Sequence, residues 1–146
     1  MIIVFSILVV PNVFASSPFV ISEEKAGGYQ YTVIKEKNTF TWIIGCQDTI
    51  FTMEENNDNT EGLKRFRIAV EDINSKIFKL IISASYFLIV VITTLILYKN
   101  NKKMFKDGGT IIVTLAVIAL YNMFVTSIDL NTAFQDANYY YLLLIK

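Results

Sequence analysis

The chain has 146 residues, of which 53% are hydrophobic and only 18% charged, and its formal net charge is zero. This composition is more apolar than that of an ordinary soluble domain, and the neutral charge gives no indication of a nucleic-acid partner. A sequence without histidine and with one cysteine excludes most zinc sites, histidine-activated nucleophiles and a disulfide framework within one copy. We therefore predict a non-enzymatic protein with no catalytic residue, no metal site and no cofactor.

The chain begins with the apolar segment "MIIVFSILVVPNVFA". Its apolar run is interrupted at Pro11 and is shorter than the roughly 20 residues that a membrane-spanning helix needs. Val13 and Ala15 provide a small-residue cleavage site. The segment predicts a signal peptide over residues 1–15, with an uncleaved anchor as the alternative.

Residues 16–59 predict a small exported β module. Residues 29–34 alternate, with Tyr29, Tyr31 and Val33 on one face, and residues 39–44 and 49–53 are rich in β-branched and aromatic side chains. The turn-rich stretches "KEKN" and "GCQD" separate the three runs and indicate an antiparallel meander. Such a sheet is too small to be stable alone, so another surface must cover its apolar face.

Residues 60–79 predict an amphipathic helix. Its apolar side chains recur at alternating spacings of three and four, which is the pattern of a heptad seam. The seam consists of Leu63, Phe66, Val70, Ile73 and Ile77. Two interpretations remain open: the seam packs on the β module of the same chain, or it packs between copies in an oligomer.

Two uncharged segments follow, at residues 80–98 and 108–128, and both meet the length and charge criteria for transmembrane helices. Asn122 lies in the second, and we expect it to hydrogen-bond a neighbouring helix as a further packing residue. Residues 99–107 predict a short basic loop that contains Lys99, Lys102, Lys103 and Lys106. Residues 129–146 predict an external aromatic tail.

The lysines of the loop predict the orientation in the membrane. Positive charge close to a span stays on the cytoplasmic side, and beyond the second span the only lysine is Lys146. We expect the loop to be cytoplasmic, the β module and the tail to lie outside, and the loop lysines to attract anionic membrane lipid. The fold class is then an α+β membrane protein: a two-helix transmembrane hairpin preceded by an amphipathic helix and a small exported antiparallel β meander.

An exported N-terminus, two spans and the short basic loop "KKMFKDGG" resemble the major pilins of conjugative type IV secretion systems. The resemblance covers residues 72–128 and is one of layout. It implies that Lys99, Lys102, Lys103 and Lys106 line the lumen of a filament and that the spans pack from subunit to subunit.

Two classes of function follow from the sequence. The first is a structural or assembly subunit of a larger membrane complex, pilin-like or not, that associates with itself or with other membrane subunits. The second is a membrane-anchored accessory protein, of the immunity or sensor type, whose exported β module captures a partner.

Overall fold

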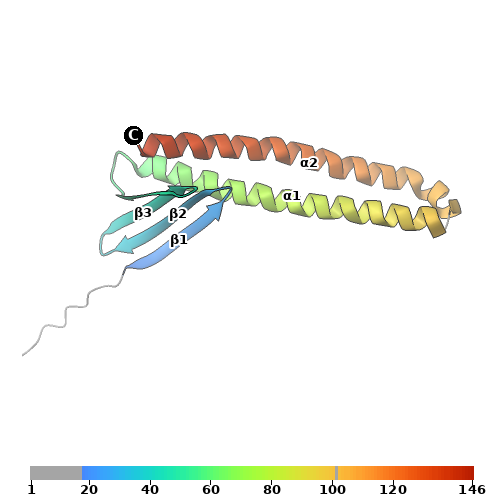
Figure 1. Cartoon of the computed structure of the whole chain (residues 1–146), viewed down its shortest axis with the longest axis horizontal. Helices are drawn as coiled ribbons and strands as arrows, with labels where there is room; N and C mark the ends of the chain where they lie inside the picture. The colour runs from blue at the N-terminus through green and yellow to red at the C-terminus, as the bar shows by residue number, and fades with distance from the viewer. Residues whose placement is uncertain (1–17, 101) are drawn as a thin grey trace, which may run out of the picture.

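The computed structural model describes residues 18–100 and 102–146, so the predicted signal peptide lies outside the described residues. The elements, in chain order, are β1 (Phe19–Ala26), β2 (Tyr29–Glu36), β3 (Thr39–Cys46), β4 (Thr49–Glu54), α1 (Thr60–Asn100) and α2 (Lys102–Leu144). A four-stranded antiparallel sheet is thus followed by two long helices, which confirms the α+β class (Figure 1).

The sheet is a meander in the order β1-β2-β3-β4, with one strand more than the sequence predicted. The additional strand, β1, lacks an apolar alternation because Ser22 and Glu24, on its helix-facing side, are polar. The signal that reveals β1 is the Gly27–Gly28 pair after it. Both glycines have positive φ, 59° and 89°, as a tight hairpin turn requires.

The start of α1 is tied to the sheet by polar side chains. Glu55 accepts hydrogen bonds from the Trp42 indole and from the Thr60 hydroxyl, each at 2.8 Å. The Asn56 side chain accepts the backbone N–H groups of Asp58 and Asn59 at 2.9 Å, which turns the chain into the helix. The acidic stretch after β4 therefore forms a structured corner.

Helices α1 and α2 each cover two of the segments predicted from the sequence. α1 runs through the predicted amphipathic helix and the first apolar segment without a break, and α2 continues from the second apolar segment to Leu144. The predicted tail is therefore mostly helix. The predicted loop is also wrong in extent, because α1 ends at Asn100 and α2 already begins at Lys102. Lysine is a good helix former, so the basic stretch extends the helices.

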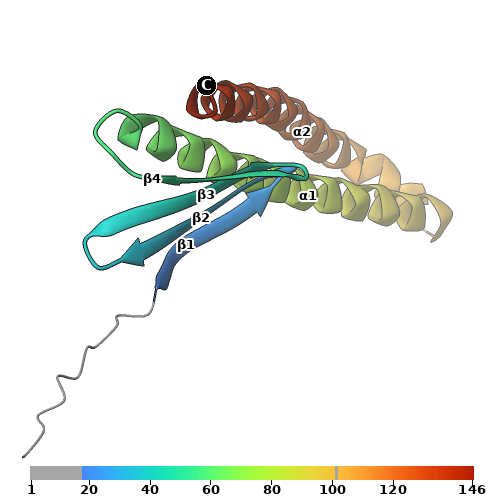
Figure 2. The same cartoon turned by 60° about the vertical axis from the view of Figure 1, so that its left-hand side comes forward.

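The sheet packs on the half of the hairpin that is remote from the tip (Figures 1 and 2). The core between them is made of apolar side chains from all three parts. The sheet contributes Ala26, Tyr31, Val33, Trp42 and Ile44; α1 contributes Leu63, Phe66, Ala69, Val70 and Ile73; α2 contributes Ala133, Ala137 and Tyr141. The two helices thus cover the apolar face of the sheet, as the small size of the sheet predicted.

The turn between β1 and β2 fits closely against both helices. A Cβ atom on Gly27 would overlap the ring of Phe134 on α2 and would lie 3.0 Å from Ile73 on α1. Nearby, the ring of Tyr29 lies edge-on to Phe66 and Tyr141, with centroids 6.2 and 6.3 Å away. Close aromatic and glycine contacts therefore fix the sheet on the hairpin.

A single heptad seam joins the two helices from the sheet domain into the apolar band. On α1 the predicted seam continues through Leu80, Ala84, Phe87, Val91 and Thr94, all half-buried. The matching buried and half-buried positions of α2 are Ile112, Ala116, Ala119, Met123, Thr126, Leu130, Ala133, Ala137, Tyr140 and Leu144. Alternating spacings of three and four on both helices are typical of antiparallel coiled-coil packing.

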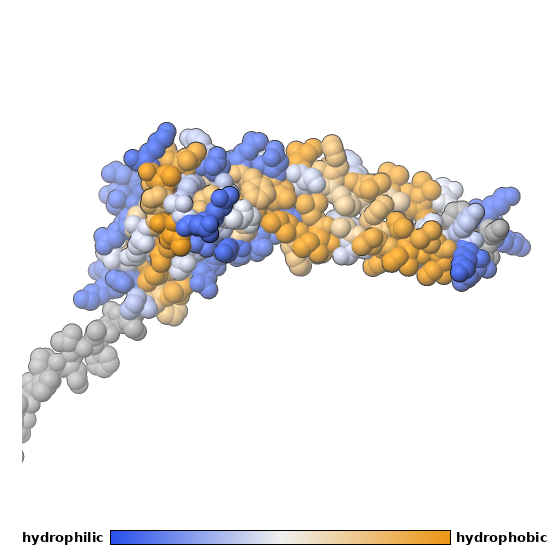
Figure 3. Space-filling view, in the orientation of Figure 1, coloured by the Kyte–Doolittle hydropathy of each residue, from blue (hydrophilic) through white to orange (hydrophobic). Residues whose placement is uncertain are grey.

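The half of the hairpin toward the tip is apolar on its outside. Both helices are long and apolar enough to cross a membrane, and the most apolar window is hardly buried in either. We call residues 80–98 and 108–128 the apolar band. Figure 3 shows the band as a continuous hydrophobic surface, with hydrophilic side chains at the tip and over the sheet domain.

Candidate functional site

The predicted packing residues of α1 lie in the core of one chain. Leu63, Phe66, Val70 and Ile73 are fully buried, and Ile77 packs at the edge of the core. Because the sheet and α2 already cover this face, these side chains are not available to a second copy. The sequence left open whether the α1 seam packs on the β module of the same chain or between copies. In the structure it packs within the chain.

Asn122 lies apart from this seam. It is exposed on α2 within the apolar band, next to Met123, which faces α1. The hydrogen bonds between described residues include none to its amide group. The structure therefore does not bring Asn122 together with the other predicted packing residues.

The basic residues gather at the tip of the hairpin. Lys99, Lys103 and Lys106 are exposed, and the ion pairs between described residues involve none of them. The side chain of Lys102 is outside the described part of the structure. At the opposite end of the apolar band, Lys76 of α1 lies 3.5 Å from the Asp129 carboxylate of α2. Charged groups thus mark both ends of the band.

A polar cluster joins the sheet to α1. The Tyr31 hydroxyl donates to Glu71 Oε1 at 2.6 Å and lies 3.2 Å from Ser22 Oγ, while Arg67 Nε lies 3.2 Å from the same carboxylate oxygen. Burial and the hydrogen bond to Glu71 raise the pKa of Tyr31 to about 12. The tyrosine therefore stays neutral and acts as a structural donor.

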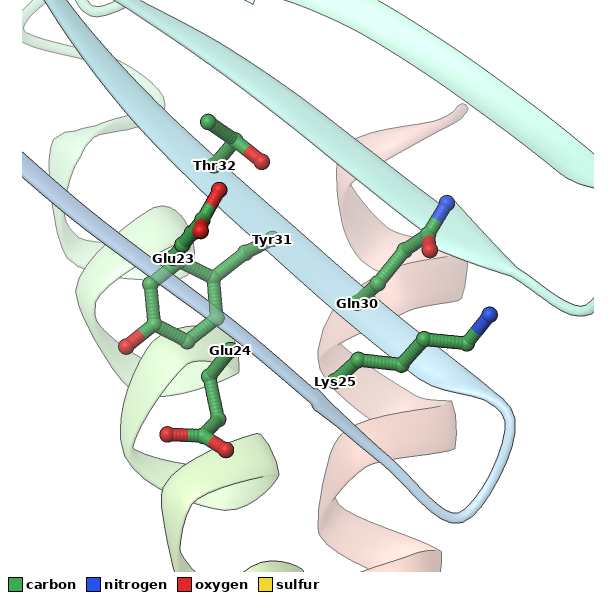
Figure 4. Close-up of a pocket in the computed structure, with 6 residues that line it drawn as sticks. All are labelled: Glu23, Glu24, Lys25, Gln30, Tyr31 and Thr32. Carbon is green, nitrogen blue, oxygen red and sulfur yellow. The ribbon is translucent and has the colours of Figure 1, made fainter. Parts of the chain in front are cut away.

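A shallow hollow of about 370 Å³ lies over β1 and β2 (Figure 4). It is lined by Glu23, Glu24, Lys25, Gln30, Tyr31 and Thr32. Lys25 and Gln30 point to one side, away from the two carboxylates. Glu24 accepts a hydrogen bond from Asn74 at 3.0 Å, and Tyr31 belongs to the cluster with Glu71. Because its polar groups diverge or have structural partners, the hollow has no converging set of reactive groups.

The part of the chain that the structure describes also contains no group of three or more histidine, cysteine or carboxylate side chains that could hold a metal ion. Cys46 is a free, half-buried thiol beside Tyr29.

The two edges of the sheet differ in their protection against pairing with another strand. β1 has an irregular register between Val20 and Ser22 and carries Glu23, Glu24 and Lys25. β4 pairs with β3 in regular register, and residues 49–53 carry no charge and no proline. Bulges and charges on an edge strand discourage pairing with a further strand. β1 is therefore protected against such pairing, whereas β4 is not; we call β4 the open edge.

The open edge also exposes apolar side chains. Ile50, on the outer face of β4, is 56% exposed, and Phe51 is 38% exposed although its ring lies 6.2 Å from that of Tyr141. Asp48 and Glu54 flank this uncharged stretch. The β4 edge therefore offers a partner an unpaired backbone with apolar side chains, the features used in β-strand addition. The sequence indicated the strand but not its edge position, which depends on the sheet order.

A comparison of the chain with models of protein families, with curated proteins and with solved structures finds no match.

Proposed function

We propose that the chain is a non-catalytic, two-span membrane protein that serves as an accessory or assembly subunit and presents its sheet to a partner protein outside the cytoplasm. One observation carries the proposal: α1 and α2 continue without a break from the apolar band into the sheet domain. A sheet held in this way has a fixed distance and orientation relative to the membrane.

The dimensions of the band support a membrane location. Its segments contain 19 and 21 uncharged residues. At about 1.5 Å per residue they are roughly 30 Å long, the thickness of the hydrocarbon core of a bilayer. The Lys76–Asp129 pair and the tip lysines then lie at the two interfaces, where charge is tolerated.

The charge distribution supports an external sheet domain. Lys99, Lys102, Lys103 and Lys106 lie between the two segments, and this cluster favours a cytoplasmic tip. On the domain side, Arg65, Arg67 and Lys76 each pair with an acidic side chain four residues away. Three of the basic residues on this side of α1 are thus ion-paired.

The open edge of β4 supports a binding role for the domain. Native edge strands often carry bulges or charges that discourage pairing; β1 has both, whereas residues 49–53 of β4 have neither. An extended segment of a partner can add to β4 through backbone hydrogen bonds, with the exposed Ile50 and Phe51 selecting apolar side chains. The acidic Asp48 and Glu54 at the ends favour a partner segment flanked by basic residues.

A matched pair of positions tests this proposal. A photo-crosslinking amino acid at Ile50 on β4 should form one defined adduct in intact cells, and the same amino acid at Ile21 on β1 should not. The two isoleucines are 56% and 47% exposed, so access to solvent is comparable. Thr52→Lys, which places a charge on the open edge, should abolish the adduct at position 50 without unfolding the domain. Equal adducts at both positions, or an adduct that survives Thr52→Lys, would contradict a role for the β4 edge.

The pilin-like alternative stays a prediction of the sequence. In that arrangement the spans pack between subunits and the tip lysines line a lumen. A self-associating subunit of this or another kind is favoured by one specific observation, the exposed Asn122 in the apolar band.

A further inference from the structure

Four serine and threonine hydroxyls of the apolar band have hydrogen-bond partners, and the Asn122 amide has none among the described residues. The hydroxyls of Ser85, Thr94, Thr114 and Ser127 each donate to the carbonyl four residues earlier, at 2.7 to 2.9 Å. The Asn122 amide makes no such bond among the described residues. An amide has two donors and one acceptor oxygen, and its unsatisfied exposure to hydrocarbon is costly. If the band is in a membrane, as proposed above, Asn122 needs a partner.

Asn122 is part of a second stripe on α2. Leu115, Ile118, Asn122 and Val125 follow one another at spacings of three, four and three. The stripe lies beside the seam that packs on α1, and Leu115, Ile118 and Asn122 are exposed. In heptad notation Asn122 occupies an a position between two d positions, where a buried asparagine sets the register of a parallel pair of helices.

The ends of the stripe coincide with the ends of the band. The next two positions in the same pattern toward the domain are Asp129 and Thr132, and Asp129 is engaged by Lys76. Two aspartates facing each other across a symmetric contact would repel, so the pattern limits close contact to the apolar band. The stripe is thus a helix-packing surface of which the hairpin itself leaves Leu115, Ile118 and Asn122 exposed.

We infer that α2 packs in parallel against α2 of a second copy through this stripe, with the two Asn122 amides hydrogen-bonded to each other. Copies inserted in the same orientation are related by a two-fold axis along the membrane normal, and such an axis places every residue at the same depth as its counterpart. Asn122 therefore meets Asn122, and an amide is its own complement because it both donates and accepts. The contact assigns a second copy of this chain as the partner in the membrane.

Cysteine crosslinking in native membranes tests the geometry. In a Cys46→Ser background, Ile118→Cys should form a disulfide-linked dimer on oxidation, and the adjacent Val117→Cys should not. The two side chains are similarly exposed, 50% and 58%, but only Ile118 lies on the stripe. Efficient crosslinking at Val117, or preferential crosslinking of position 122 to Tyr86 on α1 of another copy, would overturn the α2–α2 contact.

The role of the amide is tested by energy transfer between labelled copies in lipid vesicles. Asn122→Leu should weaken the dimer roughly 3- to 30-fold, the range expected for one interhelical hydrogen bond in a membrane. Asn122→Gln should retain part of the affinity. Thr114→Val is the matched control, because the Thr114 hydroxyl is already bonded to the Thr110 carbonyl, and it should leave the affinity unchanged. An unchanged affinity in Asn122→Leu would overturn the inference.

Failure of this inference is distinguishable from failure of the proposed function. Carbonate extraction that releases the full chain from membranes would contradict the membrane location itself. A chain that resists extraction but has the mass of one copy, and shows no energy transfer, would contradict the dimer alone and would leave the β4 docking edge as the remaining surface.

Discussion

Tyr31 shows how a single polar side chain joins the sheet to the helices. It is almost completely buried on the inner face of β2, yet its hydroxyl reaches Glu71 of α1 at 2.6 Å. Arg67 holds the same carboxylate from the outside. A buried hydroxyl needs such a partner, and the partner in turn favours the neutral form of the tyrosine. The domain is therefore sensitive to loss of this proton.

We expect the free energy of unfolding to fall between pH 10 and pH 12. In this range the unfolded chain has released the Tyr31 proton, whose ordinary pKa is 10.0, while the folded chain keeps it up to about pH 12. The folded state then binds more protons than the unfolded state, so stability decreases as pH rises. Burial also raises the pKa of Tyr29 and Tyr141, which act in the same direction.

Tyr31→Phe should therefore reduce the slope without abolishing it. The measurement is thermal unfolding of the full chain in detergent, followed by the fluorescence of Trp42, the single tryptophan, which is buried beside the cluster. If wild type and Tyr31→Phe lose stability equally between pH 10 and pH 12, the hydroxyl does not carry the effect.

At the scale of elements, the packing face of a helix can be predicted from the sequence only where apolar positions alternate with polar ones. The seam from Leu63 to Ile77 is visible because charged residues surround it. The same seam cannot be recognised between residues 80 and 98, where every position is uncharged. On α2 it includes the small residues Ala116, Ala119, Ala133 and Ala137, which allow close helix packing but stand out little by hydrophobicity.

The strands show the same limit. β2, β3 and β4 were predicted from their β-branched and aromatic content, whereas β1 was missed because its inner residues bond polar partners, Asn74 and Tyr31. The sequence predicted the two apolar segments, the hairpin and the meander. It did not predict which strand forms the open edge, because that depends on strand order and register.

Val70→Glu tests the assignment of the seam to the intramolecular core. Val70 is fully buried against the sheet and α2, so a carboxylate there lacks a partner and should destabilise the domain by about 3 kcal/mol or more. We expect red-shifted Trp42 fluorescence and a lower unfolding temperature. Ile68→Glu is the control on the same helix, because Ile68 is 56% exposed and its replacement should have little effect.

Packing between copies through the seam predicts a different result. In that case Val70→Glu would break association and leave the Trp42 environment unchanged. A folded but dissociated Val70→Glu protein would therefore contradict the core described here.

At the scale of the whole molecule, two long helices connect a domain and a tip that have different charge. α1 has 41 residues and α2 has 43, so each is about 60 Å long, twice the thickness of the hydrocarbon core. The sheet covers one half and the apolar band forms the other (Figure 3).

This arrangement predicts that the tip and the domain lie on opposite sides of the membrane, with the tip in the cytoplasm. In a Cys46→Ser background, Asp107→Cys at the tip should resist a membrane-impermeant maleimide in intact cells, and Gln135→Cys beside the sheet domain should react. Both positions are exposed, and neither change removes a lysine. Both cysteines should react after the membrane is permeabilised, which controls for accessibility. The reason is electrostatic: Lys99, Lys102, Lys103 and Lys106 lie together between the two spans, and positive charge close to a span resists translocation. Labelling in the reverse order would place the open β4 edge in the cytoplasm and would remove an external partner from the proposal.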